Sequence, residues 1–441
     1  MDAFNATSTF ISIINEFYEI FSHFFCLYLC EICIFVGENG DNDMIVNFTV
    51  GNYKSFKNKK TLSLEATAIT ELQESVIDCN GVRLLPTAVI YGANSSGKSN
   101  FLKAIIDFVR LVLSSASFNS LQKTDVIPFL LNNRTSHEPS FFEIELISKS
   151  GQYFRYGFEI DSERVISEWL YKRTSKKYER CLFVRDENGI GVTSSFKEGA
   201  GLEERTRDNA LFLSVVDSFN GKIATDIIST ISHMLPISGI AHSQFGQLST
   251  LQYKHDCLRN SSKELFDKLN FGFKDFDIPE DDAIAKKIKA YTYHTVYDDE
   301  GNEVGKTRFN MADFESEGTN KFYDIYLCIQ ATLMVGGVLI IDEFDCKLHP
   351  LITQYIIRQF NSPETNPGHG QLIFATHDTN LLSVDLFRRD QIWFVEKDSV
   401  ESSDIYSLIE FKDADGLKVR KDRSFEKDYI KGRYGAIPYI K

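Results

Sequence analysis

Residues 92–99 read Gly92-Ala93-Asn94-Ser95-Ser96-Gly97-Lys98-Ser99, and Asn100 follows. The octapeptide matches the pattern GxxxxGK[ST] in full. It lies after a short apolar run, Thr87–Tyr91, and before a stretch with helical apolar spacing at residues 101–113. A strand, a glycine-rich turn and a helix are the context in which this pattern forms a phosphate-binding loop. The sequence therefore predicts a P-loop NTPase fold of the α/β class.

The predicted loop would bind a polyphosphate mainly through its backbone. Gly92 and Gly97 allow a tight turn and a close approach to the ligand, while successive N–H groups and the helix N-terminus face its negative charge. We expect Lys98 to reach the β- and γ-phosphate oxygens and the Ser99 hydroxyl to bind Mg²⁺. The other residues of the predicted phosphate site are Asn94, Ser95, Ser96 and Asn100.

Two further strands are predicted to end in catalytic side chains. Residues 338–341 are four consecutive apolar residues, typical of a strand buried on both faces, and Asp342 and Glu343 follow. We expect Asp342 in the Mg²⁺ site and Glu343 as the general base for the attacking water. Residues 371–376 form a strand that ends at His377, which would hydrogen-bond a phosphate oxygen or that water. A histidine that only completes the core or the surface is the alternative.

Two segments are predicted to begin helices. Ser316 and Gly318 precede a helix-like stretch at residues 320–335, and Gly318 lies 24 residues before Asp342. At a helix N-terminus they would form a second anion site, but an ordinary helix cap explains them equally well. The segment at residues 348–350 reads Leu-His-Pro, which we interpret as helix entry with Pro350 in the first turn, rather than as a metal site.

The rest of the chain predicts two lobes and an insertion. Residues 141–184 contain four strand-like segments with polar turns between them, which predicts an antiparallel β-meander. Residues 205–290 show amphipathic helical stretches, and no sustained heptad indicates a long coiled coil. We predict an α/β core with a mixed or parallel sheet, an antiparallel lobe formed by the meander, and a helical insertion. The predicted parts are an extension at 1–43, an N-terminal part of the ATPase at 44–199, the insertion at 200–290 and a C-terminal part of the ATPase at 291–441.

Charge is unevenly distributed along the 441 residues. The chain has 48 basic and 62 acidic side chains, a formal net charge of −14. Residues 1–43 contain seven acidic and no basic side chains, which leaves −7 for the remainder. This acidity argues against a purely electrostatic nucleic-acid binder. Residues 417–441 hold eight basic against three acidic side chains. This fits a surface for nucleic acid or an acidic partner as well as a solvated helix followed by a packed tail.

The first 43 residues are rich in Phe, Ile and Cys but predict no membrane segment. A signal peptide needs a basic n-region, and a span needs about 20 mainly apolar residues, whereas Glu16, Glu19, His23 and Glu31 interrupt this stretch. We hypothesise that Met44 is the natural start and that the extension is dispensable. The eight cysteines are scattered, so we expect reduced thiols in a cytoplasmic protein.

The order of these motifs resembles the ABC-type ATPases of the SMC, RecF and OLD-like branch. The segments GANSSGKSN, LIIDEFDCKLHP, FATHD and GRYGAIP are similar to bacterial AAA ATP-binding proteins of the RloA/AbiLi type. The resemblance implies that residues 44–199 and 291–441 form an ABC-type head. It also implies a homodimer of such heads closed by ATP and Mg²⁺, in which Ser316 and Gly318 of one subunit cover the γ-phosphate held by the other. Asp345 would lie in the interface loop, and His377 would be the switch histidine. The sequence SEGT at residues 316–319 departs from the transporter sequence SGGQ, and no glutamine switch or adenine contact is assigned.

The resemblance also implies a role in phage defence. ATP turnover would gate an effector, often a separately encoded nuclease, and this chain shows no nuclease motif of its own. The alternative is a RecF- or SMC-like DNA-maintenance ATPase, against which the acidic composition and the missing heptads argue. A nucleotide-binding module with little turnover fits less well because Glu343 and His377 are present. A transporter subunit fits less well because SGGQ is absent.

Overall fold

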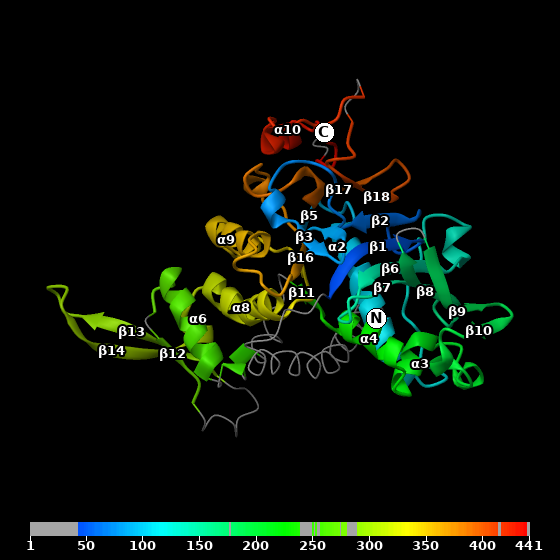
Figure 1. The fold of residues 1–441 in the computed structure, drawn as a ribbon. Coiled ribbons are helices and arrows are strands. Elements are labelled where there is room, and N and C mark those ends of the chain that lie inside the picture. Colours follow the sequence, from blue (N-terminus) through cyan, green and yellow to red (C-terminus); the bar gives the residue numbers. More distant parts are fainter. Residues whose placement is uncertain are drawn as a thin grey trace, which may run out of the picture. The chain divides into compact units, whose positions relative to one another are not determined.

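The computed structural model describes residues 43–175, 178–238, 249–250, 252–253, 256–273, 275–279, 289–412 and 416–438 (Figure 1). Contacts divide the chain into two units. The larger unit comprises Asn39–Ile237, Thr332–Glu343 and Ile357–Lys441, and the described part of the smaller unit lies within Ser238–Ala331 and Phe344–Ile356. The predictions for residues 1–42 fall outside the described residues.

A seven-stranded antiparallel sheet forms one layer of the larger unit. Its strand order is β10-β9-β8-β7-β6-β1-β2. The consecutive strands β6 to β9 pair with their neighbours along the chain, which confirms the predicted meander. The strands are β1 (Met44–Gly51), β2 (Lys60–Ser63), β6 (Ser140–Ile147), β7 (Tyr153–Ile160), β8 (Val165–Ser175), β9 (Tyr178–Asp186) and β10 (Gly189–Val192).

A six-stranded mixed sheet forms the second layer. Its order is β11-β15-β16-β5-β17-β18. The strands β15, β16, β5 and β17 are parallel to one another, and β18 is antiparallel to β17. All residues of β5 and β16 are buried, as expected for parallel strands covered on both faces. The strands are β5 (Thr87–Tyr91), β11 (Met234–Ser238), β15 (Val338–Asp342), β16 (Gln371–Ala375), β17 (Ile392–Lys397) and β18 (Ser403–Ser407).

Helix α2 (Lys98–Ser114) joins the two sheets. It contacts β1 of the antiparallel sheet and β15 and β16 of the mixed sheet. Phe101 packs edge-on against Phe48, and Phe108 stacks on Phe158 with ring centroids 5.5 Å apart. Each buried phenylalanine contributes about 1.5–3 kcal/mol relative to an exposed one. The helix that begins at Lys98 is therefore fixed by the core of the unit.

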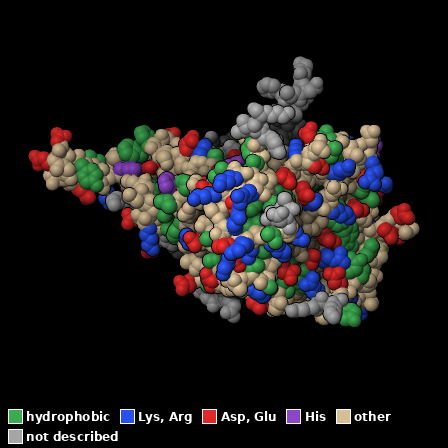
Figure 2. All heavy atoms as spheres, turned by 90° about the horizontal axis from the view of Figure 1, so that it is seen from above, with side chains coloured by type: hydrophobic (Ala, Val, Ile, Leu, Met, Phe, Trp, Pro, Cys, Tyr) green, Lys and Arg blue, Asp and Glu red, His purple; other side chains and the backbone are tan. Residues whose placement is uncertain are grey.

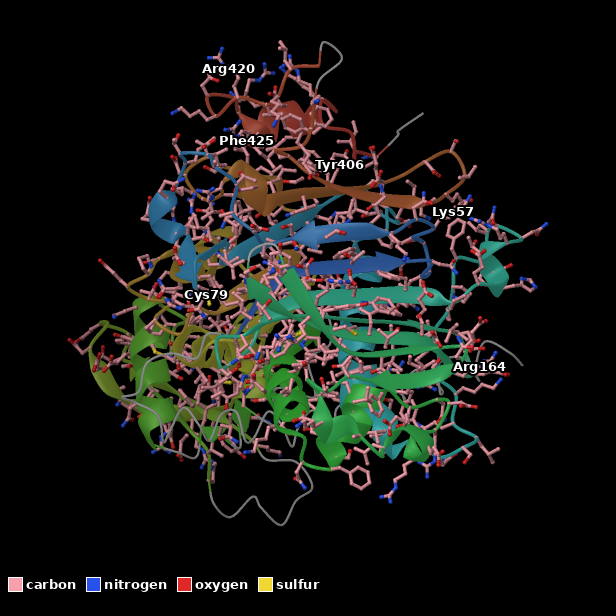
Figure 3. The ribbon with its side chains drawn as sticks, turned by 45° about the vertical axis from the view of Figure 1, so that its right-hand side comes forward. Lys57, Cys79, Arg164, Tyr406, Arg420 and Phe425 are labelled. Carbon is pink, nitrogen blue, oxygen red and sulfur yellow. The ribbon has the colours of Figure 1, made fainter. Side chains whose placement is uncertain are left out.

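The C-terminal segment packs on the edge of the mixed sheet. Tyr429 stacks on Phe394 of β17, and the Tyr406 hydroxyl donates to the Tyr434 carbonyl at 2.6 Å. Figure 3 shows Arg420 at the outer end of this segment and Phe425 nearer to Tyr406 of β18. Its basic residues are partly compensated, because Arg423 and Arg433 pair with Asp428 and Arg420 pairs with Asp422. The packed tail of the sequence interpretation is confirmed, and a nucleic-acid surface here stays a prediction.

The larger unit also contains short helices and a small hairpin. The hairpin strands are β3 (Ile77–Cys79) and β4 (Val82–Leu84), and the α-helices are α3 (Phe212–Ser218), α4 (Lys222–Ser232) and α10 (Phe425–Ile430). Turns of 3₁₀-helix lie at Gln73–Ser75, Ser115–Ser117, Thr135–His137, Lys197–Gly199, Glu203–Arg205, Thr379–Leu381 and Arg389–Gln391.

The smaller unit contains a three-stranded antiparallel sheet of order β12-β13-β14 and an aromatic cluster. In the cluster, Phe266 packs against Phe276 and Tyr323. The elements are α6 (Asp256–Lys268), β12 (Asp275–Asp277), β13 (Tyr291–Tyr297), β14 (Glu303–Asn310) and α7 (Met311–Phe314). Helices α8 (Glu317–Val335) and α9 (Pro350–Asn361) each run from the smaller into the larger unit.

The division by contacts differs from the boundaries expected from the sequence. The predicted insertion at 200–290 contains α3 and α4 of the larger unit and α6 of the smaller unit, together with β11 and β12. The four predicted parts therefore stay a prediction. Among the described residues, no helix is long and apolar enough to cross a membrane.

Candidate functional site

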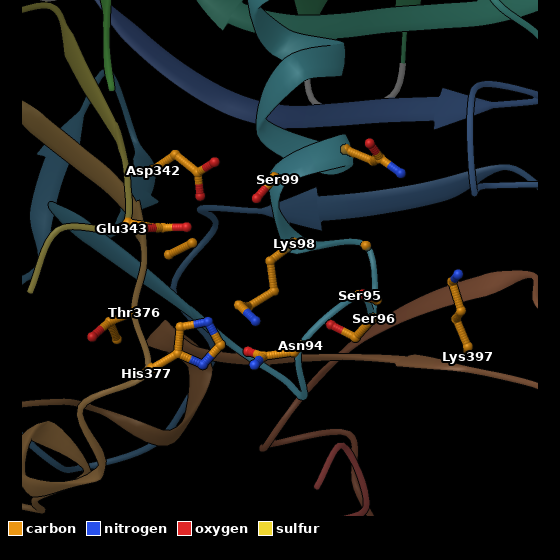
Figure 4. A pocket seen from close by; sticks show the side chains of 13 residues that line it. Asn94, Ser95, Ser96, Lys98, Ser99, Asp342, Glu343, Thr376, His377 and Lys397 are labelled. Atoms are coloured by element: carbon orange, nitrogen blue, oxygen red, sulfur yellow. The ribbon is translucent and has the colours of Figure 1, made fainter. Parts of the chain in front are cut away.

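The candidate site lies at the carboxyl ends of four adjacent parallel strands. The segments that follow β5, β15 and β16, together with the end of β17, line one cavity of about 530 Å³ (Figure 4). Ligands of open α/β sheets bind at this edge. The lining residues are Asn94, Ser95, Ser96, Gly97, Lys98, Ser99, Asn100, Asp342, Glu343, Ala375, Thr376, His377 and Lys397. The structure thus brings together the predicted loop, the acidic pair and the histidine, although they are up to 283 positions apart in the chain.

The glycines of the loop are required by close contacts. A Cβ on Gly92 would meet the carbonyl oxygen of Val395 in β17. Gly97 has φ +117°, which L-residues rarely adopt, and a Cβ there would meet the Ser403 hydroxyl. The loop therefore follows a path against β17 and β18 that only glycine permits at these two positions.

Lys98 places a buried positive charge inside the loop. Its side chain is 6% exposed, and Nζ donates to the carbonyl oxygens of Gly92 at 2.7 Å and Ala93 at 3.1 Å. Phosphate oxygens compete well for such a donor, since charge-assisted hydrogen bonds are roughly twice as strong as neutral ones. The ammonium group is therefore already oriented for an anion held by the loop.

Hydrogen bonds anchor the loop at Ser96 and Asn100, but the Ser96 hydroxyl itself is unsatisfied. Ser403 Oγ donates to the carbonyl of Ser96 at 2.6 Å, and Asn100 Nδ2 donates to Ser55 Oγ at 2.9 Å. The Ser96 hydroxyl is buried and has no hydrogen-bond partner among the described residues. A buried hydroxyl without a partner is destabilising by about 1–3 kcal/mol. A phosphate oxygen in the cavity would satisfy it.

The acidic pair meets the start of α2 across the cavity. In Figure 4, Asp342 and Glu343 project from the end of β15 toward Lys98 and Ser99, and His377 projects from the end of β16. Asp342 Oδ1 is buried without a hydrogen-bond partner among the described residues. A buried carboxylate oxygen needs a donor or a cation. One carboxylate and one hydroxyl in a phosphate pocket suit Mg²⁺, which keeps several waters and takes substrate phosphates as ligands. The residues present therefore fit this ion.

Glu343 has a strained backbone. Its φ is +53°, in the left-handed region that non-glycine residues rarely occupy. Such conformations are destabilising by about 1–3 kcal/mol and occur at functional sites. The chain passes from the larger to the smaller unit directly after this residue. The strained position therefore coincides with a residue that lines the candidate cavity.

Ser316 and Gly318 lie in the smaller unit, not in this cavity. Ser316 Oγ accepts the Thr319 N–H at 3.1 Å, which confirms the helix cap; the anion site stays a prediction. A Cβ on Gly318 would lie 2.6 Å from the Lys347 carbonyl oxygen. The buried Lys321 ammonium donates to the carbonyls of Phe344 and Cys346. The start of α8 is therefore held against the segment that follows Glu343.

A second cavity of about 760 Å³ surrounds the start of α8 in the smaller unit. The described residues that line it include the cationic side chains Lys268 and Lys347, together with His349, and no carboxylate. Pro350 begins α9, and His349 Nδ1 accepts the Leu351 N–H at 3.2 Å, which confirms the predicted helix entry. We call this cavity the signature pocket and define it by Ser316, Gly318, Thr319, Lys347 and His349.

Sequence reasoning missed two residues of the nucleotide cavity. Lys397 lines it from the last position of β17, and Ser403 on β18 anchors the loop at Ser96. The apolar run at residues 392–395 predicts a strand whose end would reach the same edge, so Lys397 carried a signal. Ser403 carried none, because its role depends on the pairing of β18 with β17.

A P-loop after a central parallel strand, with an acidic pair at the end of a nearby strand, defines a P-loop NTPase fold. The chain belongs to the family described as "AAA domain, putative AbiEii toxin, Type IV TA system", whose model matches residues 88–383. The match includes the loop, the acidic pair and His377.

Solved structures similar to this chain include heads of SMC proteins. The SMC head domain from Thermotoga maritima is 12% identical with a TM-score of 0.36, over 82% of this chain and 98% of that one. The Smc head domain with a coiled coil and joint derived from Pyrococcus yayanosii is 9% identical with a TM-score of 0.40, over 82% and 96%. An SmcHead bound to the C-winged helix domain of ScpA is 14% identical with a TM-score of 0.39, over 82% and 97%. No curated protein sequence matches the chain.

Proposed function

We propose that this protein binds ATP with Mg²⁺ in the 530 Å³ cavity and hydrolyses it to ADP and phosphate. The observation that carries the proposal is the meeting of the glycine-rich loop, the acidic pair and His377 around one cavity at the strand ends. The membership in an AAA domain family supports a nucleotide-hydrolysing activity of this kind.

Each residue has a distinct role in the proposed reaction. The loop amides, Lys98 and the Ser96 hydroxyl would bind the phosphates, and Ser99 with Asp342 would hold Mg²⁺, which supplies charge neutralisation. Glu343 would take the proton of the attacking water, and its fixed backbone would hold the carboxylate in place. His377 would donate a hydrogen bond to a γ-phosphate oxygen.

The signature pocket is proposed to complete the site in a homodimer. Lys268, Lys347 and the N-terminus of the 19-residue helix α8 lie at this cavity, and the Lys347 ammonium pairs with the Glu317 carboxylate at 3.2 Å. Such a surface complements the γ-phosphate of a nucleotide held by another copy of the chain. Ser316 and Gly318 would cover that phosphate, and Asp345 would lie in the loop between the two copies.

At the level of the cell, we propose that ATP turnover gates a partner effector in anti-phage defence of the RloA/AbiLi type. The family description, which names a putative toxin of a toxin–antitoxin system, supports a protein that acts in growth control together with a partner. The test is phage challenge of cells that carry the gene and its neighbours. We expect protection with the wild-type chain and none with Lys98→Ala; equal protection would contradict this role.

The ATPase proposal is tested by steady-state phosphate release from the purified full chain with Mg²⁺ and ATP. We expect turnover that depends on protein concentration, because the site requires two copies. We also expect Glu343→Gln to accumulate an ATP-bound dimer. If the wild-type chain binds ATP but releases no phosphate, the ATPase proposal is wrong and the protein is a nucleotide-binding module.

A further inference from the structure

The sheet of the smaller unit extends into a two-stranded ribbon. β12 pairs only with Tyr291, Thr292 and Tyr293 of β13, and beyond them β13 pairs with β14 alone among the described strands. Figure 1 shows this ribbon extending past α6 of the same unit. We call residues 294–307 the arm. A two-stranded ribbon without a covering layer is marginally stable in water, which indicates that a further strand or surface completes it.

The arm presents an open edge and exposed apolar side chains. Residues 303–306 of β14 are exposed, and among the described strands β14 pairs only with β13. Val304 is 61% exposed and Tyr297 is 55% exposed. An edge of this kind offers unpaired N–H and C=O groups to another strand. The arm is therefore suited to strand addition by an extended segment.

The tip of the arm is acidic and ordered. Residues 298–303 contain four carboxylates and no basic side chain. Asp298 Oδ1 accepts the N–H groups of Glu300 at 3.0 Å and Asn302 at 2.8 Å, which shapes the turn. Figure 2 shows acidic side chains at the outer end of the projecting arm. Lys306 on β14 is the one basic side chain of the arm, so the four carboxylates leave it a formal charge of −3. This charge repels nucleic acid and attracts a basic peptide, so the arm fits a protein partner.

The base of the arm is linked to the signature pocket through Glu315. The Glu315 side chain is 7% exposed and accepts hydrogen bonds from Thr292 Oγ1 at 2.6 Å and from His294 Nε2 at 2.7 Å. The next residue, Ser316, caps α8, and only α7 separates Glu315 from the end of β14. The Glu315 N–H also donates to the Met311 carbonyl at 3.0 Å. A displacement of β13 would therefore reach the start of α8 without a flexible linker.

We propose that the arm binds an extended, basic segment of a partner protein by strand addition to β14. Glu315 is then the positioning residue that couples this binding to Ser316 and Gly318. The inference rests on the proposed function, since it names the chemistry of the partner and the regulation of the same ATPase site. Coupling of this kind changes ATP turnover when the arm is occupied.

The docking step is tested on the full chain with a synthetic eight-residue peptide of alternating Lys and Val, against a Glu and Val peptide. We expect the lysine peptide to bind with a Kd of about 10 μM in fluorescence anisotropy and to protect β14 amides from hydrogen exchange. The triple variant Asp299→Lys, Glu300→Lys, Glu303→Lys should bind it about tenfold more weakly with unchanged basal phosphate release. The control Glu163→Lys, Glu187→Lys, Glu204→Lys changes three exposed carboxylates elsewhere and should bind normally. No binding, or equal loss in the control, would overturn the docking site.

The coupling step is tested by phosphate release with and without the lysine peptide. We expect the peptide to change the ATP turnover of the wild type by about threefold. Glu315→Ala should still bind the peptide but show no change in turnover, and Glu315→Gln should retain part of the change. Asp313→Asn, on α7, should respond as the wild type. A full response of Glu315→Ala would overturn the role of Glu315. A chain that binds the peptide but never hydrolyses ATP would refute the proposed function and leave the docking site standing.

Discussion

The nucleotide cavity and the signature pocket are held in different ways. The first is set by buried strands, and its Lys98 is 6% exposed. The second lies at the start of α8, where Lys347 and His349 are exposed and Thr319 is buried, and it is held by hydrogen bonds of the Thr319 N–H and the Lys321 ammonium. The first contains two carboxylates and the second, among its described lining residues, none. The proposed general base and the proposed metal ligand therefore both lie in the first, and we propose that the second acts on a nucleotide held by another copy of the chain.

The largest expected effect is on turnover in the nucleotide cavity. Glu343→Gln should lower kcat by about 1000-fold, since the general base is lost, while ATP affinity stays within about threefold. Phosphate release and nucleotide titration measure the two quantities. Asp385→Asn, an exposed carboxylate that lines neither cavity, is the control and should retain turnover. Normal hydrolysis by Glu343→Gln would show that another group activates the water.

The next effect separates the two pockets by nucleotide affinity. Lys98→Ala should weaken ATP and ADP binding by about 100-fold, because a buried charge-assisted contact is lost. Lys347→Ala removes a lysine of the signature pocket and should leave ADP binding unchanged. Calorimetric titration of the separate variants measures both. Equal losses in the two variants would contradict the assignment of the nucleotide to the larger unit.

Metal removal sharpens the assignment of Asp342. With Mg²⁺ present, Asp342→Asn should bind ATP about tenfold more weakly than the wild type, because the buried Oδ1 loses its charge. With EDTA the difference should disappear or reverse, since the carboxylate then only repels the phosphates. Paired titrations in the two conditions give the result. A loss that is the same with and without Mg²⁺ would place the ion elsewhere.

A smaller effect is expected from the signature pocket. Gly318→Ala should lower ATP turnover by about tenfold, since its Cβ displaces the Lys347 carbonyl, and it should leave ADP affinity unchanged. The control is Gly191→Ala on β10, where the added Cβ would lie 3.7 Å from the Val184 carbonyl, an ordinary contact. Lost ADP binding in Gly318→Ala would mean that the two pockets are not separate.

The smallest effect concerns pH and the stability of the smaller unit. Burial raises the pKa of Asp324 on α8 to about 8. The unfolded carboxyl ionises near pH 4, so the folded chain binds the extra proton between these values and stability falls as pH rises toward 8. Asp324→Asn should lose less stability between pH 6 and 8, by roughly 3 °C in melting temperature. An identical pH dependence in both chains would mean that Asp324 is not protonated.

Local sequence patterns predicted most residues of the nucleotide cavity. The residues that they missed are placed by contacts between segments far apart in the sequence. The loop of Gly92–Ser99, the strand before Asp342 and the meander are each encoded in a short stretch, because burial on both faces or on one face leaves a periodic pattern. The parallel arrangement of β5, β15 and β16 then brings their ends together.

The remaining features depend on contacts between distant segments. Ser403 reaches the loop only because β18 pairs with β17, and Lys321 acts on carbonyls more than 20 residues away. Glu315 reads as an ordinary acidic residue until β13 places Thr292 and His294 beside it. The boundary between the two units after Glu343 could not be predicted from composition. It falls between Glu343 and Phe344, inside one continuous sequence motif.

The central claim is that the nucleotide cavity of one chain works with the signature pocket of another. It is tested by mixing two inactive full-length variants, Lys98→Ala and Ser316→Arg, and measuring phosphate release. When equal amounts of the two variants pair at random, half of the dimers contain one copy of each variant. Each mixed dimer has one intact composite site out of two, so about a quarter of wild-type activity should return. Activity that stays at the sum of the two inactive variants would contradict the claim.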